Sequence, residues 1–246
     1  PWTVSTRTLG SAFSMLAILA LVALAFTAPL FVSRSVVQDL FFILTMLVLA
    51  QCWNLLAGYA GLVSVGQQAF VGFGAYAMFA GVSLLGMDPM AAILLGGLAA
   101  LALSVPTAFF AFRLQGAYFA IGTWVIAEVT RLLIAQWKAL GGGTGTSLPR
   151  EATGNIMGTD AIQALFGVRE AAARDILAYW LALALVVVVT GCIYWLLRSR
   201  LGLALAAVRD NVEAAQSVGV DFGRLKWAGV LNASAATGPT GAVVFV

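Results

Sequence analysis

Apolar runs of about twenty residues recur along this chain, and they constrain its fold more than any other feature of the sequence. A run of this length crosses a bilayer as a helix, because a helix rises about 1.5 Å per residue and the hydrocarbon core is roughly 30 Å thick. Only 9% of the 246 residues are charged, whereas soluble domains carry about a quarter. The sequence therefore predicts an all-α, polytopic helical membrane protein.

About seven spans are expected, in one transmembrane domain that covers 1–246. The complete spans are expected over 12–32, 36–57, a glycine-rich stretch that ends near Gly86, 90–112, 117–137 and 176–197. The glycine-rich stretch, 58–86, is either a full crossing or a re-entrant segment. The seventh span begins near Leu225 and is cut off. Because the chain starts at Pro1 and stops inside an apolar run, we expect it to be incomplete at both ends.

The basic residues predict the orientation of these spans, since loops rich in Lys and Arg stay in the cytoplasm. Five of the thirteen basic residues lie within 198–226, which we therefore expect to be a cytoplasmic loop. The polar segment 138–175 carries four basic and four acidic residues, and counting the spans makes it an external loop. Arg34 is the exception to the pattern, because the same count places it on the outer side.

The cytoplasmic loop 198–226 has the pattern of an amphipathic helix. Its apolar residues recur at steps of four, three, four and three, which places them on one face. These residues are Leu201, Leu205, Val208, Val212 and Ala215. A turn through Gly219 and Gly223 is expected to follow. Such a helix either rests on the lipid surface or seats its apolar face in a groove of a soluble partner, and both interpretations stay open.

The stretch 58–76 is dense in glycine and also contains Ser64, Gln67 and Gln68. One interpretation is a helix broken near Gly66, with the polar side chains lining a translocation path. Irregular backbone at membrane depth is tolerated only where it is buried in protein or lines a cavity. The other interpretation is close helix packing through the glycines, with the glutamines hydrogen-bonded between helices.

Glu128 and Arg131 lie three residues apart in the fifth predicted span, on one face of its helix. Charges inside a span are costly, so they are usually paired or turned toward the interior of a bundle. In one interpretation these two residues line or gate the translocation path. In the other they form an intrahelical ion pair near the outer end of the span, which holds the bundle together.

Catalytic and metal-binding chemistry finds little support in this sequence. The chain has no His, which removes the commonest general base and metal ligand, and no nucleophile–base pair can be assembled. The glycine-rich loop 141–149 resembles a phosphate loop only superficially, since it lacks the lysine and follows no strand. We expect no catalytic residue, no metal site, no bound cofactor and, with a net charge of +3, no nucleic-acid partner.

Glu213, Ala214 and Ala215, followed by Gly219, resemble the EAA-loop signature of permease subunits in bacterial ABC importers. Three longer stretches sharpen this resemblance: 55–76, 116–133 and 199–226. Together they make the chain similar to the LivM-type branched-chain amino-acid permease family over about 54–241.

The resemblance implies a permease subunit that imports branched-chain or other hydrophobic amino acids across the bacterial cytoplasmic (inner) membrane. It implies a LivH-type second permease, two ATP-binding subunits that carry ATP and Mg²⁺, and an external substrate-binding protein. Glu213 and Gly219 match the motif that docks on the ATPase, whereas Pro239 departs from the family's pattern. Urea and short-amide permeases are similar to this family and stay an alternative. An ion-coupled secondary transporter is disfavoured because the spans offer few ionisable residues.

Overall fold

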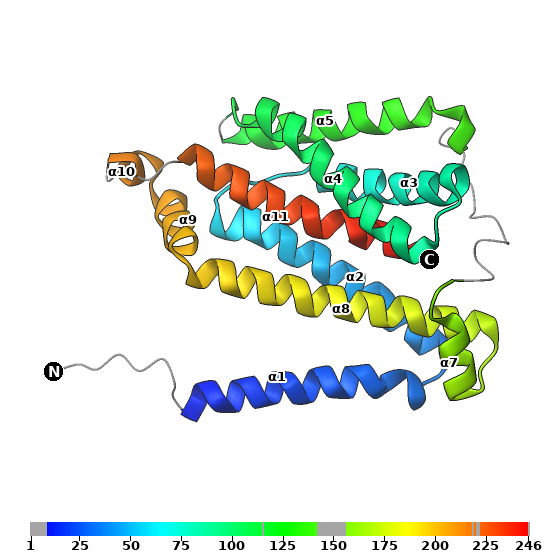
Figure 1. The fold of residues 1–246 in the computed structure, drawn as a ribbon. Coiled ribbons are helices and arrows are strands. Elements are labelled where there is room, and N and C mark those ends of the chain that lie inside the picture. Colours follow the sequence, from blue (N-terminus) through cyan, green and yellow to red (C-terminus); the bar gives the residue numbers. More distant parts are fainter. Residues whose placement is uncertain (1–8, 115, 142–155, 218, 220–221, 246) are drawn as a thin grey trace.

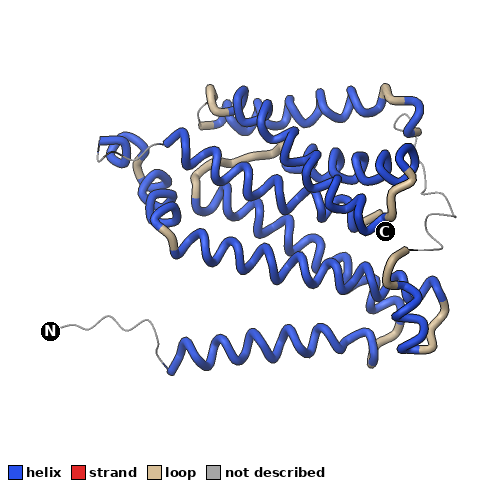
Figure 2. Tube along the Cα trace, viewed as in Figure 1, coloured by secondary structure: helices blue, strands red, loops and turns tan. Residues whose placement is uncertain are grey.

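The computed structural model of the protein describes residues 9–114, 116–141, 156–217, 219 and 222–245. Within these residues the chain is helical and shows no strand (Figure 2). The long helices run side by side, so that their connections gather at two opposite ends of the molecule (Figure 1). This arrangement confirms the predicted all-α, polytopic membrane fold.

The helices follow the apolar runs of the sequence. In chain order they are α1 (Leu9–Thr27), α2 (Arg34–Asn54), α3 (Gln67–Leu85), α4 (Pro89–Ala111), α5 (Ala117–Ala135), α7 (Thr159–Phe166), α8 (Glu170–Arg198), α9 (Arg200–Asp210), α10 (Val212–Ser217) and α11 (Phe222–Val243). Six helical segments of the described chain are long and apolar enough to cross a membrane, and they correspond to α1 to α5 and α8. α11 has 22 residues but includes Arg224, Lys226 and many small polar residues, so its crossing remains a prediction.

Glycines let α3, α4 and α11 touch through their backbones. A Cβ atom added at Gly96 of α4 would lie 2.6 Å from the carbonyl oxygen of Gly74 in α3. One added at Gly74 would lie 2.7 Å from the Cα atom of Gly238 in α11. Helices in lipid gain little from burying apolar surface, so close backbone packing holds these three together. The interpretation of the glycines as packing residues therefore applies to Gly74.

α11 lies beside α4, α3 and α2 and carries hydroxyl groups on its buried face (Figure 1). Ser234, Thr237 and Thr240 each donate to a carbonyl oxygen one turn earlier in α11, at 2.8 to 3.3 Å. Pro239 lies within the helix, and a Cβ atom at Gly97 of α4 would come within 2.9 Å of the proline Cγ atom. A glycine on the neighbouring helix thus makes room for the proline.

α1 stands apart from the other helices over most of its length (Figure 1). Its contacts with α8 include a hydrogen bond from Tyr179 Oη to the Ala25 carbonyl oxygen at 2.7 Å. Trp180 Nε1 donates to the Phe26 carbonyl oxygen at 3.1 Å, and the two rings stack with centroids 4.9 Å apart. Large apolar side chains of α1 such as Phe13 are exposed, which fits a helix in contact with lipid.

The polar segment 138–175 contains more helix than the external loop that the sequence predicts. α7 lies within it, and α8 begins at Glu170, ahead of the predicted start of the sixth span at Ile176. The reason is a small apolar cluster hidden among the polar residues. It consists of Ile156, Ile162, Ala173, Ile176 and Leu177. The glycine-rich loop 141–149 lies outside the described residues except for Gly141.

Arg34 has an acidic partner in the structure. This residue begins α2 and forms an ion pair with Asp175 of α8, which also accepts a hydrogen bond from Gln38 Nε2 at 3.2 Å. The pair joins α2 to α8 at the end of the molecule where α7 lies (Figure 1). The basic residue that does not fit the predicted orientation thus has a structural role.

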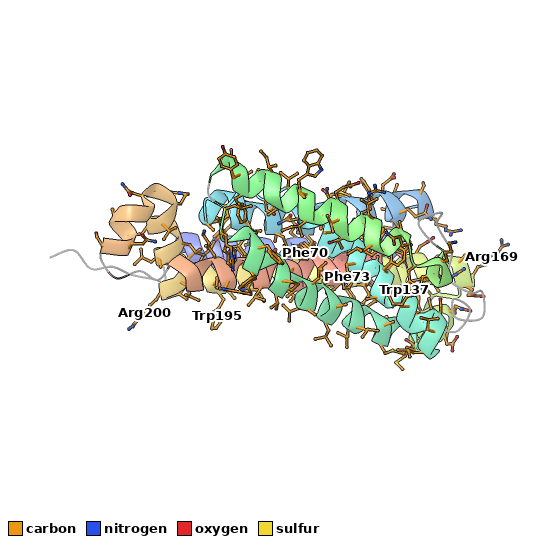
Figure 3. All side chains as sticks on the ribbon, turned by 90° about the horizontal axis from the view of Figure 1, so that it is seen from above. Phe70, Phe73, Trp137, Arg169, Trp195 and Arg200 are labelled. Atoms are coloured by element: carbon orange, nitrogen blue, oxygen red, sulfur yellow. The ribbon has the colours of Figure 1, made fainter. Side chains whose placement is uncertain are left out.

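The two ends of the molecule make the predicted orientation testable. α7 lies at one end and α9 and α10 at the other, and the labelled Arg169 and Arg200 mark these ends in a second view (Figure 3). In a Cys192→Ala background, the basic-residue asymmetry predicts that Asp160→Cys reacts with a membrane-impermeant maleimide in intact cells. Asp210→Cys should react only after permeabilisation. Labelling of position 210 from outside would contradict the orientation.

Candidate functional site

A break separates α2 from α3 inside the bundle. α2 continues into a π-helical turn, Leu55–Tyr59, and the chain is then irregular until α3 begins at Gln67. The irregular segment runs from one end of the molecule toward its middle, where α3 starts (Figure 1). The helix break predicted near Gly66 is therefore present, and α3 itself is long enough to span a membrane.

Hydrogen bonds hold this irregular segment against α2 and α5. Val65 N–H donates to Thr123 Oγ1 at 3.2 Å, and Trp53 Nε1 donates to the Ser64 carbonyl oxygen at 3.2 Å. A Cβ atom at Gly66 would lie 3.0 Å from the carbonyl carbon of Thr123, so this crossing needs a glycine. The Ser64 hydroxyl is buried and accepts from Gly66 N–H at 3.4 Å. Ser64 therefore supports the segment's own backbone.

A groove of about 380 Å³ lies between α3 and α5. The residues that matter for its chemistry are Gln68, Gly72, Phe73 and Tyr76 from α3 and Glu128, Arg131 and Ile134 from α5. Of the residues that the sequence places near a translocation path, the structure therefore brings Gln68, Glu128 and Arg131 together. Ser64 and Gln67 do not line this groove. Gln67 Nε2 is buried and has no hydrogen-bond partner in the described part of the chain.

Glu128 and Arg131 form an ion pair on the exposed face of α5, with Arg131 Nε donating to Glu128 Oε2 at 3.0 Å. The predicted intrahelical ion pair is therefore present, and because both residues belong to one helix, it does not by itself join α5 to a neighbour. Glu128 is the twelfth and Arg131 the fifteenth of the 19 residues of α5, so both lie within a helix that is long enough to span a membrane. Charges within a membrane span usually face a protein or a water-filled path.

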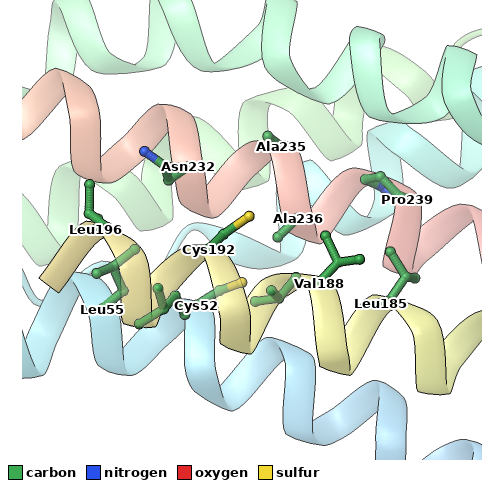
Figure 4. Close-up of a pocket in the computed structure, with 12 residues that line it drawn as sticks. Cys52, Leu55, Leu185, Val188, Cys192, Leu196, Asn232, Ala235, Ala236 and Pro239 are labelled. Carbon is green, nitrogen blue, oxygen red and sulfur yellow. The ribbon is translucent and has the colours of Figure 1, made fainter. Parts of the chain in front are cut away.

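A second hollow, of about 280 Å³, lies among α2, α8 and α11 (Figure 4). Its walls are apolar side chains and the free cysteines Cys52 and Cys192, with Asn232 as the polar exception. Asn232 Nδ2 donates to the Ala228 carbonyl oxygen of its own helix at 2.8 Å. No charged side chain is among the described residues that line this hollow, so the groove between α3 and α5 is the candidate path.

The predicted amphipathic helix is two helices in the structure. α9 ends at Asp210, Asn211 is extended with φ −158° and ψ 110°, and α10 follows. Polar side chains cap the start of each helix. Ser199 Oγ accepts from Leu201 N–H at 3.2 Å, and Asn211 Oδ1 accepts from Ala214 N–H at 3.0 Å. Asparagine is a favoured N-cap, so this capping interrupts the helix despite its continuous apolar periodicity.

Part of the apolar stripe of this α9–α10 segment, residues 200–217 and Gly219, packs on the chain itself. Leu205, Val208 and Ala215 are each buried. They lie in one cluster with Leu55 and with Phe119 of α5. These three residues are therefore covered by the end of the bundle, while Leu201 remains 41% exposed, so docking of the stripe on a soluble partner stays a prediction.

The outward surface of the α9–α10 segment combines polar residues with the exposed apolar residues Leu201, Leu203 and Ala207. Its exposed residues include Arg200, Arg209, Asp210, Asn211, Ala214, Gln216 and Ser217. Gly219 follows α10 with φ +87°, and a Cβ atom added there would meet nothing within 4 Å. Of the predicted signature, Ala214 is exposed and Ala215 is buried, while the side chain of Glu213 lies outside what the structure describes.

Arg209 connects the α9–α10 segment to the break between α2 and α3. Its Nη1 donates to the Gly58 carbonyl oxygen at 3.3 Å, while Nε and Nη2 donate to Asp210 Oδ1 at 3.0 Å. A Cβ atom at Gly61, where φ is +67°, would lie 3.5 Å from the Cα atom of Arg209. No sequence signal points to this contact, since helical periodicity only places Arg209 on the polar face.

Comparison with known proteins decides the family. The model of the family described as "Branched-chain amino acid transport system / permease component" matches residues 35–246. The chain belongs to this family. The predicted resemblance is thereby confirmed. The matched residues include the groove, the break before α3 and the α9–α10 segment, whereas α1 lies before the match.

Two relatives of this permease family carry the same description. Each is called "High-affinity branched-chain amino acid transport system permease protein LivM", one from Escherichia coli strain K12 and one from Salmonella typhimurium strain LT2. The chain is 31% and 30% identical to them over 220 residues, which is 85% of this chain and 52% of each relative. The chain thus spans about half the length of these relatives. No solved structure matches it.

Proposed function

We propose that this chain is a permease subunit of a bacterial ABC importer for branched-chain or other hydrophobic amino acids. The observation that carries the proposal is the family match over 35–246, which includes the groove and the α9–α10 segment. The relatives named above are described as parts of a branched-chain amino acid transport system. In this role the chain forms part of the path, and its partners hydrolyse ATP.

The proposed assembly contains a second, LivH-type permease, two ATP-binding subunits that bind ATP and Mg²⁺, and an external substrate-binding protein. It lies in the bacterial cytoplasmic membrane. The exposed ion pair of Glu128 and Arg131 supports a second permease, because charges within a membrane span need a protein or a water-filled path beside them. The polar outward surface around Ala214 and Gly219 supports a soluble partner at that end.

Uptake assays test the proposed function. The chain is produced with its partner subunits, reconstituted in proteoliposomes, and supplied with binding protein and internal ATP. We expect ATP-dependent accumulation of leucine. ATP-dependent accumulation of urea without leucine would favour the amide-permease alternative, and accumulation driven by an ion gradient without ATP would favour a secondary transporter.

Substitution by leucine is expected to have different effects at the two neighbouring glutamines that begin α3. Gln67→Leu removes a buried amide nitrogen that has no partner in the described chain, so we expect unchanged uptake and an unfolding free energy higher by about 1 kcal/mol. Gln68 is exposed in the groove, and Gln68→Leu should lower leucine uptake severalfold. Normal uptake in both single variants and in the double variant, with assembly verified, would count against a path at this groove.

A further inference from the structure

Unused hydrogen-bonding capacity faces the groove between α3 and α5. A guanidinium carries five N–H donors, and Glu128 accepts from Nε and Nη2 of Arg131. The remaining donors of Arg131 have no acceptor among the described residues. The side chains of Arg131 and Glu128 are 64% and 47% exposed, respectively. The wall of the groove therefore carries a cationic and an anionic group side by side.

Apolar surface lies next to this pair. Phe73, Tyr76 and Ile134 line the groove and also border an adjoining hollow of about 300 Å³, whose walls include Trp137 and are almost wholly apolar. Gly72 keeps the groove open, because it is exposed and a Cβ atom added there would meet nothing within 4 Å. Charged groups of both signs thus adjoin a space that suits an aliphatic side chain.

Building on the proposed function, we propose that this groove is a transient subsite for the zwitterion of the imported amino acid. Arg131 receives the α-carboxylate, since guanidinium and carboxylate match as a planar, bidentate pair. Glu128 accepts hydrogen bonds from the α-ammonium group, and the aliphatic side chain lies against Phe73 and Ile134. The zwitterion replaces the intrahelical ion pair with two new ones, so Arg131 and Glu128 each keep an ionic partner when it binds.

The charges of this groove separate amino acids from other solutes. Urea and short amides carry neither a carboxylate nor an ammonium group, so they would leave Arg131 and Glu128 without ionic partners within a membrane span, where that is costly. An inorganic anion would match Arg131 but would be repelled by Glu128. A zwitterion matches both groups at once and leaves no net charge in the groove.

The first test removes one charge at a time from the complete transporter in proteoliposomes. Arg131→Gln and Glu128→Gln each take away a charge and keep a polar side chain. We expect each variant to lower ATP-dependent leucine uptake about tenfold or more, because a charge-assisted hydrogen bond to the substrate is lost. The second permease and the ATP-binding subunits should still co-purify with each variant. Uptake within about twofold of wild type in both variants would overturn the proposal.

A charge exchange separates recognition from structural support. The double variant Glu128→Arg, Arg131→Glu keeps an ion pair on the same face of α5 but reverses its ends relative to the apolar hollow. Uptake should stay low, because the ammonium and carboxylate groups would meet the wrong partners. Restored uptake would overturn the proposal, since it would show that the pair is only structural. Failure of the proposed function can be distinguished from failure of this subsite proposal, because in the first case the wild-type transporter itself would not accumulate leucine.

Filling the groove provides an independent variant that is expected to fold. Gly72→Leu places a side chain in the open groove, and Gly191→Leu is the matched control in α8, where an added Cβ atom also meets nothing within 4 Å. We expect Gly72→Leu to lower leucine uptake about tenfold and the control to stay within about twofold of wild type. Unchanged uptake by Gly72→Leu would overturn the proposal. Loss of the second permease from the purified Gly72→Leu complex would also overturn it, because the groove would then be an assembly surface.

Discussion

Replacing Gly74 with leucine is expected to destabilise the folded protein strongly. A Cβ atom at Gly74 would lie 2.7 Å from the Cα atom of Gly238 in α11, and Gly96 of α4 approaches the Gly74 carbonyl oxygen. These neighbours are backbone atoms that cannot rotate away, so α3 would have to separate from both helices. Overpacking a core costs about 1–3 kcal/mol, and a clash with helix backbones belongs at or above the upper end of that range.

The matched control for this prediction is Gly72→Leu in the same helix. Both substitutions replace a helical glycine of α3, but at Gly72 the added Cβ atom meets nothing within 4 Å. We expect a monodisperse size-exclusion peak and a near-native unfolding midpoint for Gly72→Leu. Gly74→Leu should aggregate or unfold roughly 6–12 °C lower, the shift that about 3 kcal/mol gives in a chain of this size. Equal midpoints for the two variants would contradict the close packing of α3 against α4 and α11.

The spans could be predicted from the sequence because hydropathy is a local property. α4 and α5 begin within a residue of their predicted starts, at Pro89 and Ala117. The prediction fails at α8, which begins at Glu170, because its first turns mix charged residues with apolar ones. Ala173 packs in a cluster whose other members include Ile156 and Ile162, and a local hydropathy pattern cannot show this contact.

The helical periodicity of the sequence identifies apolar residues of the α9–α10 segment, but it does not show which part of the molecule they pack against. The buried positions Leu205, Val208 and Ala215 belong to the predicted stripe, so the pattern itself is real. Its partner is the end of the bundle, where Leu55 lies, and only the tertiary structure supplies that information. The break at Asn211 was missed because capping by a single side chain leaves the apolar spacing unchanged.

The groove could be predicted only in part. Gln68, Glu128 and Arg131 stand out in the sequence because polar residues are rare within spans. Their meeting in one groove depends on α3 lying beside α5, which the break before α3 makes possible by starting that helix in the middle of the bundle (Figure 1). Phe73 and Ile134 carry no signal of their own, because apolar residues are common in every span.

Replacing Gly219 with aspartate is expected to uncouple transport from ATP hydrolysis while the protein stays folded. Gly219 is exposed beyond α10, and a Cβ atom there would meet nothing within 4 Å, so the chain itself leaves room for a side chain. Because Leu205, Val208 and Ala215 pack inward, we expect an ATP-binding subunit to contact the exposed surface around Ala214 and Gly219. We expect leucine uptake to fall about tenfold or more, with loss of the ATP-binding subunits from the purified complex or of transport-coupled ATP hydrolysis.

Gly167→Asp is the matched control for this coupling prediction. Gly167 ends α7 at the opposite end of the molecule with φ +62°, and its surroundings are equally open. Both substitutions impose similar left-handed backbone strain, about 1–2 kcal/mol, so a difference between them measures contact with a partner. If the segment only rests on anionic lipid through Arg209, both variants should be equally mild. Unchanged subunit association together with unchanged uptake in Gly219→Asp would exclude a coupling role for this turn.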